Sequence, residues 1–205
     1  MQWETKRGNL TRNPVDGVER VTEPAKLPSF PTPKEAKKLL EHSDRYDAAM
    51  WTLLLSTGLR RGSFVSLTPE SFRQDGIWVP KTKRRREWFI SYADGCPLWR
   101  PELSDVGKYV WETQPPTPSI VTRHLKRCCG AAGLDYGCHA LRHAFASWLV
   151  MMGEHMNDVS AWCHHTSTRT TEKYVHLRPR GLEQIEKNRE RIRRLMERGL
   201  QTCLP

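Results

Sequence analysis

The stretch from His139 to His143 reads His-Ala-Leu-Arg-His and places two imidazoles and one guanidinium within five residues. If this stretch is helical, residues three and four apart share a face, so His139, Arg142 and His143 should project to one side. Arg142 can then offer a planar pair of donors to two oxygens of a phosphodiester. Taken alone, the stretch is equally well interpreted as a solvated polar face.

A second chemical group, the phenol of Tyr174, lies 32 residues after Arg142 and nine after His165. A phenolic hydroxyl attacks phosphorus when a nearby group takes up its proton. The alternative is structural, because a tyrosine on a helix face is more often part of the core. In the same way, His165 near Trp162 is more often a packed histidine.

Two basic segments come earlier in the chain. Arg60 and Arg61 follow Thr57-Gly58-Leu59, where the glycine permits a tight turn after an apolar helix. The segment Lys81-Thr82-Lys83-Arg84-Arg85-Arg86 has five basic residues in six and is expected to form a turn between two strands. The alternative for Arg60 and Arg61 is that they are ordinary surface cations. The alternative for the basic turn is a solvated loop or a nonspecific contact with phosphate.

The elements that must position these groups are mainly helical. Capping residues, glycine stops and apolar periodicity predict helices, and β-forming residues between Asp75 and Gly95 predict a hairpin. In the helix expected over about 139–152, Leu141, Phe145, Trp148, Leu149 and Met152 should form the buried stripe. The expected fold class is α+β, mainly α-helical with a small antiparallel sheet. The expected helices are a first one from Thr32-Pro33, then about 45–56, 117–133, 139–152, 156–163, 168–176 and 181–200.

Composition narrows the class of partner. The chain of 205 residues is 38% hydrophobic, which suffices for one ordinary core, and 33 Lys and Arg against 23 Asp and Glu give a net charge of +10. That charge favours nucleic acid or an anionic membrane surface. The sequence has neither an apolar run long enough for a membrane span nor a signal peptide. We therefore expect a soluble, intracellular protein.

The six cysteines are expected to be reduced thiols, because the sequence has no Cys-x-x-Cys pair and no sign of secretion. Cys138-His139 together with Cys163-His164-His165 is the alternative, a zinc set. The short ligand spacing typical of zinc sites is absent from each half.

In their order, these motifs resemble the catalytic domain of tyrosine recombinases, the lambda-type phage integrases and Xer-type enzymes, over about residues 25–178. The shared pattern is Thr-Gly-Leu-Arg, a lysine in a basic β-turn, His-x-Leu-Arg-His, and a His and a Tyr nine residues apart. The resemblance implies the catalytic set Arg60, Lys81, His139, Arg142, His165 and Tyr174, with Lys83 as the alternative lysine. It also departs at two positions, since Ser63 stands where the family usually has an acidic residue and His164 where it usually has glycine.

The resemblance implies a site-specific recombinase that forms a 3′-phosphotyrosyl intermediate without metal, ATP or any other cofactor. Arg60 and Arg142 would clamp the scissile phosphate, and His165 would add a hydrogen bond. His139 would help accept the tyrosine proton, and Lys81 would protonate the leaving 5′-oxygen. Two alternatives are a type IB topoisomerase-like enzyme and a noncatalytic DNA-binding module. DNA contacts are expected from Arg61, Lys83, Arg84, Arg85 and Lys173.

The same resemblance predicts the organisation and the partners. Residues 1–24 would link to an N-terminal DNA-clamping domain that this sequence lacks, 25–178 would form the catalytic domain, and 179–205 a C-terminal helical tail. The expected partner is double-stranded DNA, bound by a homo-tetramer that is monomeric alone. The tail would dock on a neighbouring protomer or pack on its own domain. The expected setting is a phage or mobile element in a prokaryotic cytoplasm, associated with the nucleoid.

Overall fold

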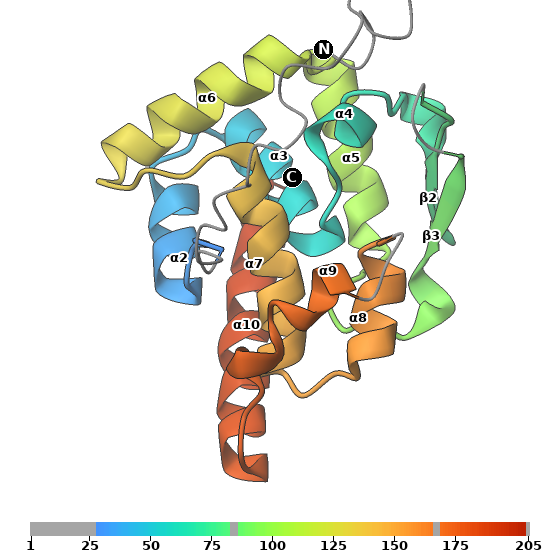
Figure 1. The fold of residues 1–205 in the computed structure, drawn as a ribbon. Coiled ribbons are helices and arrows are strands. Elements are labelled where there is room, and N and C mark those ends of the chain that lie inside the picture. The colour runs from blue at the N-terminus through green and yellow to red at the C-terminus, as the bar shows by residue number, and fades with distance from the viewer. Residues whose placement is uncertain (1–27, 83–85, 166–168, 204–205) are drawn as a thin grey trace, which may run out of the picture.

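The computed structural model describes residues 28–82, 86–165 and 169–203. Helices form the body of the molecule, and a small sheet lies along one side of it (Figure 1). The α+β class expected from the sequence is confirmed. The elements are α2 (Pro33–Glu41), α3 (Arg45–Thr57), α4 (Arg61–Phe64), η1 (Pro69–Ser71), β1 (Phe72–Arg73), β2 (Gly76–Val79), β3 (Trp88–Ser91), η2 (Tyr92–Asp94), α5 (Glu102–Thr113), α6 (Pro118–Ala131), α7 (Cys138–Met151), α8 (Met156–Trp162), α9 (Arg169–Glu172), η3 (Val175–Leu177) and α10 (Leu182–Cys203).

Helix α3 is the centre of the fold, because α5, α7 and α10 all pack against it. It is buried all round from Asp47 to Thr57, as expected of a helix enclosed by others. The predicted stop is confirmed: Gly58 ends α3 in the left-handed conformation, with φ 61°. At the start of α2 the predicted cap is also present, since Thr32 and Glu35 form a capping box.

The sheet has the strand order β1-β2-β3 and is antiparallel throughout. Ile77 pairs with Ile90, and both side chains are buried. The predicted hairpin is therefore confirmed, and β1 adds a short third strand. The basic turn predicted at its tip lies partly outside the described residues, which leave out 83–85.

Helix α7 confirms the predicted core stripe, because Leu141, Phe145, Trp148, Leu149 and Met152 are all at most 2% exposed. The segment after α8 differs from the prediction of one helix over 168–176. Helix α9 ends at Glu172, a turn follows at residues 173–174, and η3 then begins. The turn directs Tyr174 into the protein, where it is 2% exposed. This tertiary burial, rather than helix periodicity, determines the local backbone.

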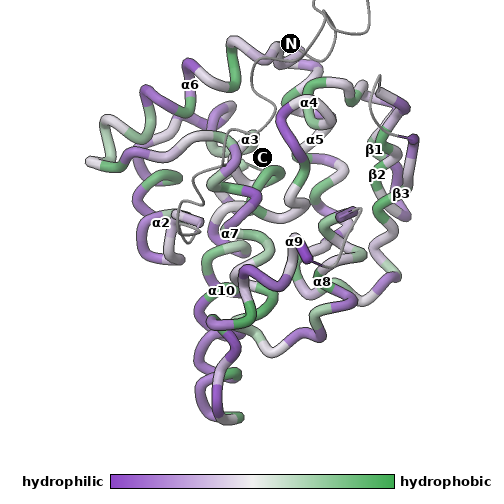
Figure 2. Tube along the Cα trace, viewed as in Figure 1, coloured by the Kyte–Doolittle hydropathy of each residue, from purple (hydrophilic) through white to green (hydrophobic). Residues whose placement is uncertain are grey.

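Helix α10 completes the core. Hydrophilic and hydrophobic residues alternate along it (Figure 2), and its apolar side packs on α3, α2, α7 and α5. Ile192 is fully buried, and Leu195 and Met196 are each 5% exposed. The predicted tail helix therefore packs on its own chain in this structure. Within the described ranges, no helix is both long and apolar enough to cross a membrane.

Helix α5 was not among the expected elements, although its apolar residues recur at helical spacing. Leu103, Val106 and Val110 are fully buried. Gly107 interrupts this apolar pattern within α5. A larger residue would not fit there, because a Cβ would lie 2.0 Å from Cε1 of Phe72. The glycine allows α5 to approach the strand that carries Phe72.

Candidate active site

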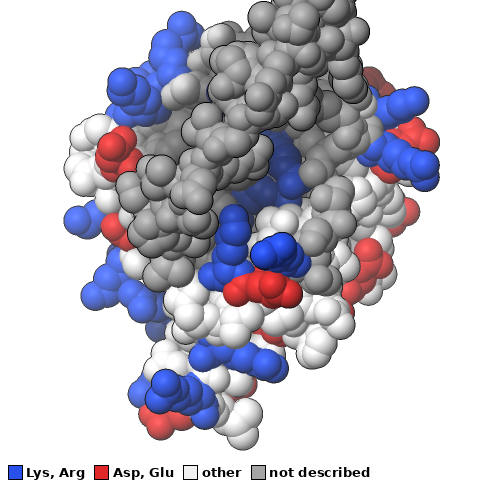
Figure 3. All heavy atoms as spheres, in the orientation of Figure 1, with Lys and Arg blue, Asp and Glu red and all other residues white. Residues whose placement is uncertain are grey.

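Four segments of the chain supply the groups of the candidate site: the start of α4, helix α7, the end of α8, and the turn after α9 (Figure 1). Figure 3 shows Lys and Arg atoms near the centre of this face, close to the position of α4, α7 and α9. Clustered positive charge attracts an anion. The fold therefore forms a cationic site where the sequence motifs meet.

Arg142 joins these segments. Its Nη1 donates a hydrogen bond to the carbonyl oxygen of Gly58, and its Nη2 donates one to that of Cys163. These carbonyls stand two residues before Arg60 and two before His165. Arg142 is 6% exposed, so it is buried rather than part of the solvated polar face considered from the sequence. The two hydrogen bonds from its guanidinium to carbonyl oxygens offset part of the free-energy cost of burying the charge.

The backbone turn whose carbonyl accepts from Arg142 requires glycine at position 58. Its φ of 61° suits glycine, and a Cβ there would lie 2.3 Å from Cδ1 of Phe145 on α7. The tight turn then places Arg60 at the N-cap of α4, where it is half-buried. Ser63, at the position where the family usually has an acidic residue, is 4% exposed within α4.

Tyr174 faces an imidazole. Its hydroxyl is hydrogen-bonded to Nδ1 of His143 at 2.5 Å, and the two ring centroids are 5.9 Å apart. Burial raises the pKa of Tyr174 to about 12, Cys163 adds to the rise and Arg142 opposes it. The phenol is therefore protonated at neutral pH. The sequence motif contains His143 but does not by itself indicate a chemical role for it. The signal that could have indicated one is its position beside Arg142 and four residues after His139.

The two histidines of α7 contact each other and share a positive environment. Their rings meet edge to face, with centroids 4.8 Å apart. Burial and then the charges of Arg142, Arg60 and Lys173 lower the pKa of His139. Burial, followed by His139, Arg142 and Lys173, lowers the pKa of His143 to about 4. Both imidazoles are therefore neutral near pH 7, and the cations that act on them favour an anionic ligand.

His165 is held by the segment that carries the tyrosine. Its Nδ1 lies 2.8 Å from Oγ1 of Thr171, which is 1% exposed on α9. Its backbone N–H donates to the carbonyl oxygen of Ser160 at 3.0 Å. These contacts fix the imidazole between α8 and α9.

The preceding residue, His164, has φ 50°, the left-handed conformation that glycine would adopt with least strain. Its ring stacks on the indole of Trp88, with centroids 4.5 Å apart and an interplanar angle of 11°. Trp88 begins β3, directly after the basic turn. Having histidine rather than glycine at position 164 thus adds a contact between the segment after α8 and the sheet.

The other predicted residues are less enclosed. Lys81 is exposed and precedes the undescribed residues 83–85, so Lys83, Arg84 and Arg85 lie outside the described part of the chain. Arg61 is exposed, and its Nη1 donates to Oγ1 of Thr122 at 2.6 Å. Lys173 is exposed too, although its charge acts on both α7 histidines. The linker predicted at 1–24 also lies outside the described residues.

For the zinc alternative, the described residues contain no group of three or more His, Cys, Asp or Glu side chains placed to hold a metal ion. Cys163 is 1% exposed, and burial raises its pKa to about 11. Its thiol is therefore protonated near pH 7, whereas a zinc ligand would be a thiolate.

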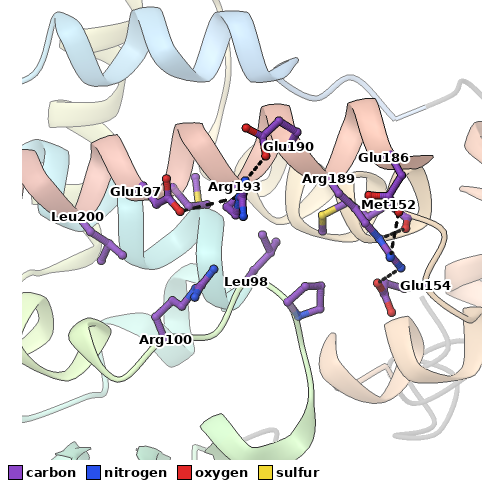
Figure 4. Close-up of a pocket in the computed structure, with 12 residues that line it drawn as sticks. Leu98, Arg100, Met152, Glu154, Glu186, Arg189, Glu190, Arg193, Glu197 and Leu200 are labelled. Atoms are coloured by element: carbon purple, nitrogen blue, oxygen red, sulfur yellow. Dashed lines mark hydrogen bonds and ion pairs between the residues drawn. The ribbon is translucent and has the colours of Figure 1, made fainter. Parts of the chain in front are cut away.

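A separate groove of about 380 Å³ runs along α10 (Figure 4). Ion pairs line it: Arg189 pairs with Glu154 at 3.3 Å, and with Glu186 of the same helix at 3.6 Å. None of the described site residues lines this groove. We therefore place the candidate active site at the histidine and tyrosine cluster rather than here.

Known proteins resemble this chain in both sequence and structure. Residues 30–180 match the model of the phage integrase family. A tyrosine recombinase of Pseudothermotoga lettingae is 29% identical, over 80% of this chain and 62% of its own length. The tyrosine recombinase XerD of Haemophilus influenzae is 30% identical, over 85% and 63%. The chain thus spans less than two thirds of the length of these relatives.

Solved structures share the fold. The crystal structure of XerA recombinase gives a TM-score of 0.63 at 20% identity, over 94% of this chain and 72% of that one. The catalytic domain of bacteriophage HP1 integrase gives 0.58 at 21% identity, over 78% and 94%. A lambda integrase dimer bound to a COC′ core site gives 0.66 at 16% identity, over 88% and 57%. With the family model matching most of its length, the chain belongs to the phage integrase family.

Proposed function

We propose that this chain is the catalytic part of a tyrosine-type site-specific recombinase, which cuts and rejoins DNA strands through a covalent bond to Tyr174. One observation carries the proposal: the Tyr174 hydroxyl is bonded to a neutral imidazole beside a buried arginine. A hydroxyl nucleophile, a proton acceptor and a cationic phosphate site are the three groups that metal-free phosphodiester cleavage needs.

The remaining roles follow from the chemistry of the reaction. Arg60 and Arg142 bind the non-bridging oxygens of the scissile phosphate and offset the charge that develops there. His165 adds a hydrogen bond to the same phosphate, and His139 assists the tyrosine side of the reaction. Lys81 donates a proton to the 5′-oxygen as it leaves. The 3′-phosphotyrosyl bond retains the energy of the broken linkage, so religation needs no ATP.

The relatives favour recombination over the two alternatives. The two relatives quoted above are tyrosine recombinases, and the family model is that of the phage integrases. A noncatalytic binding module could also bury a tyrosine bonded to an imidazole, so the formation of a covalent adduct with DNA distinguishes it. A type IB topoisomerase-like enzyme uses similar chemistry, and the products of the reaction distinguish it.

The proposed partner is double-stranded DNA, in line with the net charge of +10 and with the DNA-bound lambda integrase of the same fold. Arg61, Lys83, Arg84, Arg85 and Lys173 would contact its backbone. We further propose a homo-tetramer on DNA and a nucleoid-associated enzyme of the prokaryotic cytoplasm. Exchange of the 179–205 tail between protomers would require α10 to leave the core of its own chain. Residues 1–24 would link the 25–178 domain to a DNA-clamping domain.

The test begins with a pool of DNA duplexes that carry a random central segment and a nick in one strand. Cleavage next to the nick releases a short fragment and traps the protein on DNA, and sequencing of trapped strands gives the site. Two copies of that site in one plasmid should then yield deletion or inversion products. Relaxed plasmid without such products would identify a topoisomerase, and DNA binding without trapped strands would identify a binding module.

A further inference from the structure

The proposed roles leave His143 without a function, although it is the residue that contacts the nucleophile. We propose that His143 is a catalytic residue of strand cleavage: its Nδ1 accepts the Tyr174 proton as the phenolic oxygen attacks phosphorus, and returns it during religation. The inference rests on the proposed function and names the proton acceptor within the same site.

Geometry assigns this role to His143 rather than to His139. In the described part of the chain, His143 is the side chain whose ring nitrogen hydrogen-bonds the Tyr174 hydroxyl, at 2.5 Å. His139 instead meets the ring of His143 edge to face. A general base must lie within hydrogen-bond reach of the proton that it removes, and His143 meets this condition before DNA is bound. His139 would then act through His143, as a positioning residue.

The protonation states of His143 and Tyr174 also suit a proton transfer from the phenol to the imidazole. Burial and nearby cations keep the pKa of His143 at about 4, so its ring is neutral near pH 7. A neutral imidazole that bears its proton on Nε2 has a lone pair on Nδ1, and the protonated phenol donates to it. The acceptor and the donor are therefore both in the form that the reaction requires.

Substrate binding would strengthen this base. Burial, followed by His139, Arg142 and Lys173, lowers the pKa of His143, and Arg142 keeps its charge at every pH of interest. A phosphodiester bound to Arg142 brings a negative charge that offsets this repulsion, so the pKa of His143 rises when DNA is in place. In the absence of DNA the hydrogen bond persists without proton transfer, and Tyr174 stays unreactive.

The reaction step balances in atoms and charge. The Oη–H bond of Tyr174 breaks, its proton moves to Nδ1 of His143, and the oxygen forms a bond to phosphorus. The bond between phosphorus and the 5′-oxygen breaks, and that oxygen takes a proton from the general acid, for which Lys81 is proposed. Religation reverses both transfers, so the imidazolium of His143 returns its proton to the leaving phenolate of Tyr174.

The first experiment separates proton transfer from simple positioning. In His143→Asn, the amide oxygen takes a place close to that of Nδ1 and still accepts the tyrosine hydrogen bond, but an amide does not take up a proton near neutral pH. Loss of a general base should slow adduct formation on a nicked duplex about 100-fold. DNA affinity and the melting temperature serve as controls for folding. Cleavage by His143→Asn within threefold of the wild-type rate would overturn the proposal.

The second experiment uses His143→Ala, which leaves space for a small base beside Tyr174. Free imidazole should restore part of the cleavage rate, and substituted imidazoles of higher pKa should restore more, because the base takes up a proton in the transition state. A purely structural role would not give this dependence. No rescue, or a rescued rate independent of the pKa of the base, would overturn the proposal.

The third experiment assigns the proton transfer to the tyrosine side of the reaction. A DNA strand with sulfur in place of the bridging 5′-oxygen has a leaving group that needs no proton. Lys81→Ala should regain cleavage on this strand, and His143→Asn should remain slow. Recovery of His143→Asn would contradict the role given to His143. If the wild-type chain itself formed no adduct, the proposed function would fail; a normal wild-type rate with an equally fast His143→Asn would remove only this inference.

Discussion

The imidazole of His164 stacks on the indole of Trp88, with ring centroids 4.5 Å apart, while its own backbone is in the left-handed region at φ 50°. The contact joins the end of α8 to the first residue of β3. A favourable side-chain contact and an unfavourable backbone conformation therefore occur at the same residue.

These two effects predict an order of stability. His164→Gly loses the stack but relieves the backbone, and His164→Ala loses the stack and keeps the strain. We expect His164→Ala to be less stable than His164→Gly by about 1 kcal/mol, the usual cost of a left-handed residue other than glycine. Urea unfolding of the two variants measures the difference. Equal stabilities would show that the turn relaxes when the ring is removed.

The turn at Gly58 gives a second prediction. In Gly58→Ala, the new methyl would lie 2.3 Å from Cδ1 of Phe145 at a position with φ 61°, so the free energy of unfolding should fall by more than about 2 kcal/mol. Gly62→Ala is the matched control, because in the described part of the chain no atom outside the local backbone lies within 4 Å of its new Cβ. The control should be as stable as the wild type or slightly more stable. Similar losses in both variants would contradict the close packing of the turn on α7.

Local signals in the sequence predicted much of this fold. The cap at Thr32, the stop at Gly58 and the stripe from Leu141 to Met152 each depend on neighbours within one or two helical turns, and the structure agrees. The α5 helix was also detectable from its periodicity, but Gly107 interrupts its pattern. That glycine is explained only by the contact with Phe72.

The site was harder to predict than the fold because its contacts are long-range. Motif spacing indicated Arg142 and Tyr174 but did not show that Arg142 bonds the carbonyls of Gly58 and Cys163, which are far from it in sequence. Similarly, Tyr174 was expected on a helix, and the backbone turns there instead to bring its hydroxyl to His143. No local pattern specifies which of two neighbouring histidines a distant tyrosine will reach.

The double contact of Arg142 predicts that lysine cannot replace it. An ammonium cannot reproduce a planar fork, so Arg142→Lys should lose at least about 100-fold in adduct formation. Loss of a charged hydrogen bond to a buried carbonyl should also lower the free energy of unfolding by about 2 kcal/mol. Arg123→Lys, at an exposed position of α6, is the control. A wild-type cleavage rate in Arg142→Lys would rule out its role at the phosphate.

The lowered pKa of His143 predicts how stability depends on pH. The unfolded chain takes up a proton at this residue near pH 6.5, but the folded protein does so only near pH 4. The free energy of unfolding should therefore fall as the pH drops through this window, because protons favour the unfolded state. His143→Asn removes this contribution, so its melting temperature should fall less between pH 7 and pH 4.5. An equal fall in both proteins would show that His143 is not shielded in the folded state.

The proposed function requires that Tyr174 itself becomes bonded to DNA. Mass spectrometry of the protein trapped on a nicked duplex, after digestion of both protein and DNA, measures this bond. We expect a nucleotide phosphate attached to the peptide that contains Tyr174. Tyr174→Phe should give no adduct and should bind the same DNA nearly as well as the wild type. An adduct on another residue, or one that persists in Tyr174→Phe, would show that Tyr174 is not the nucleophile.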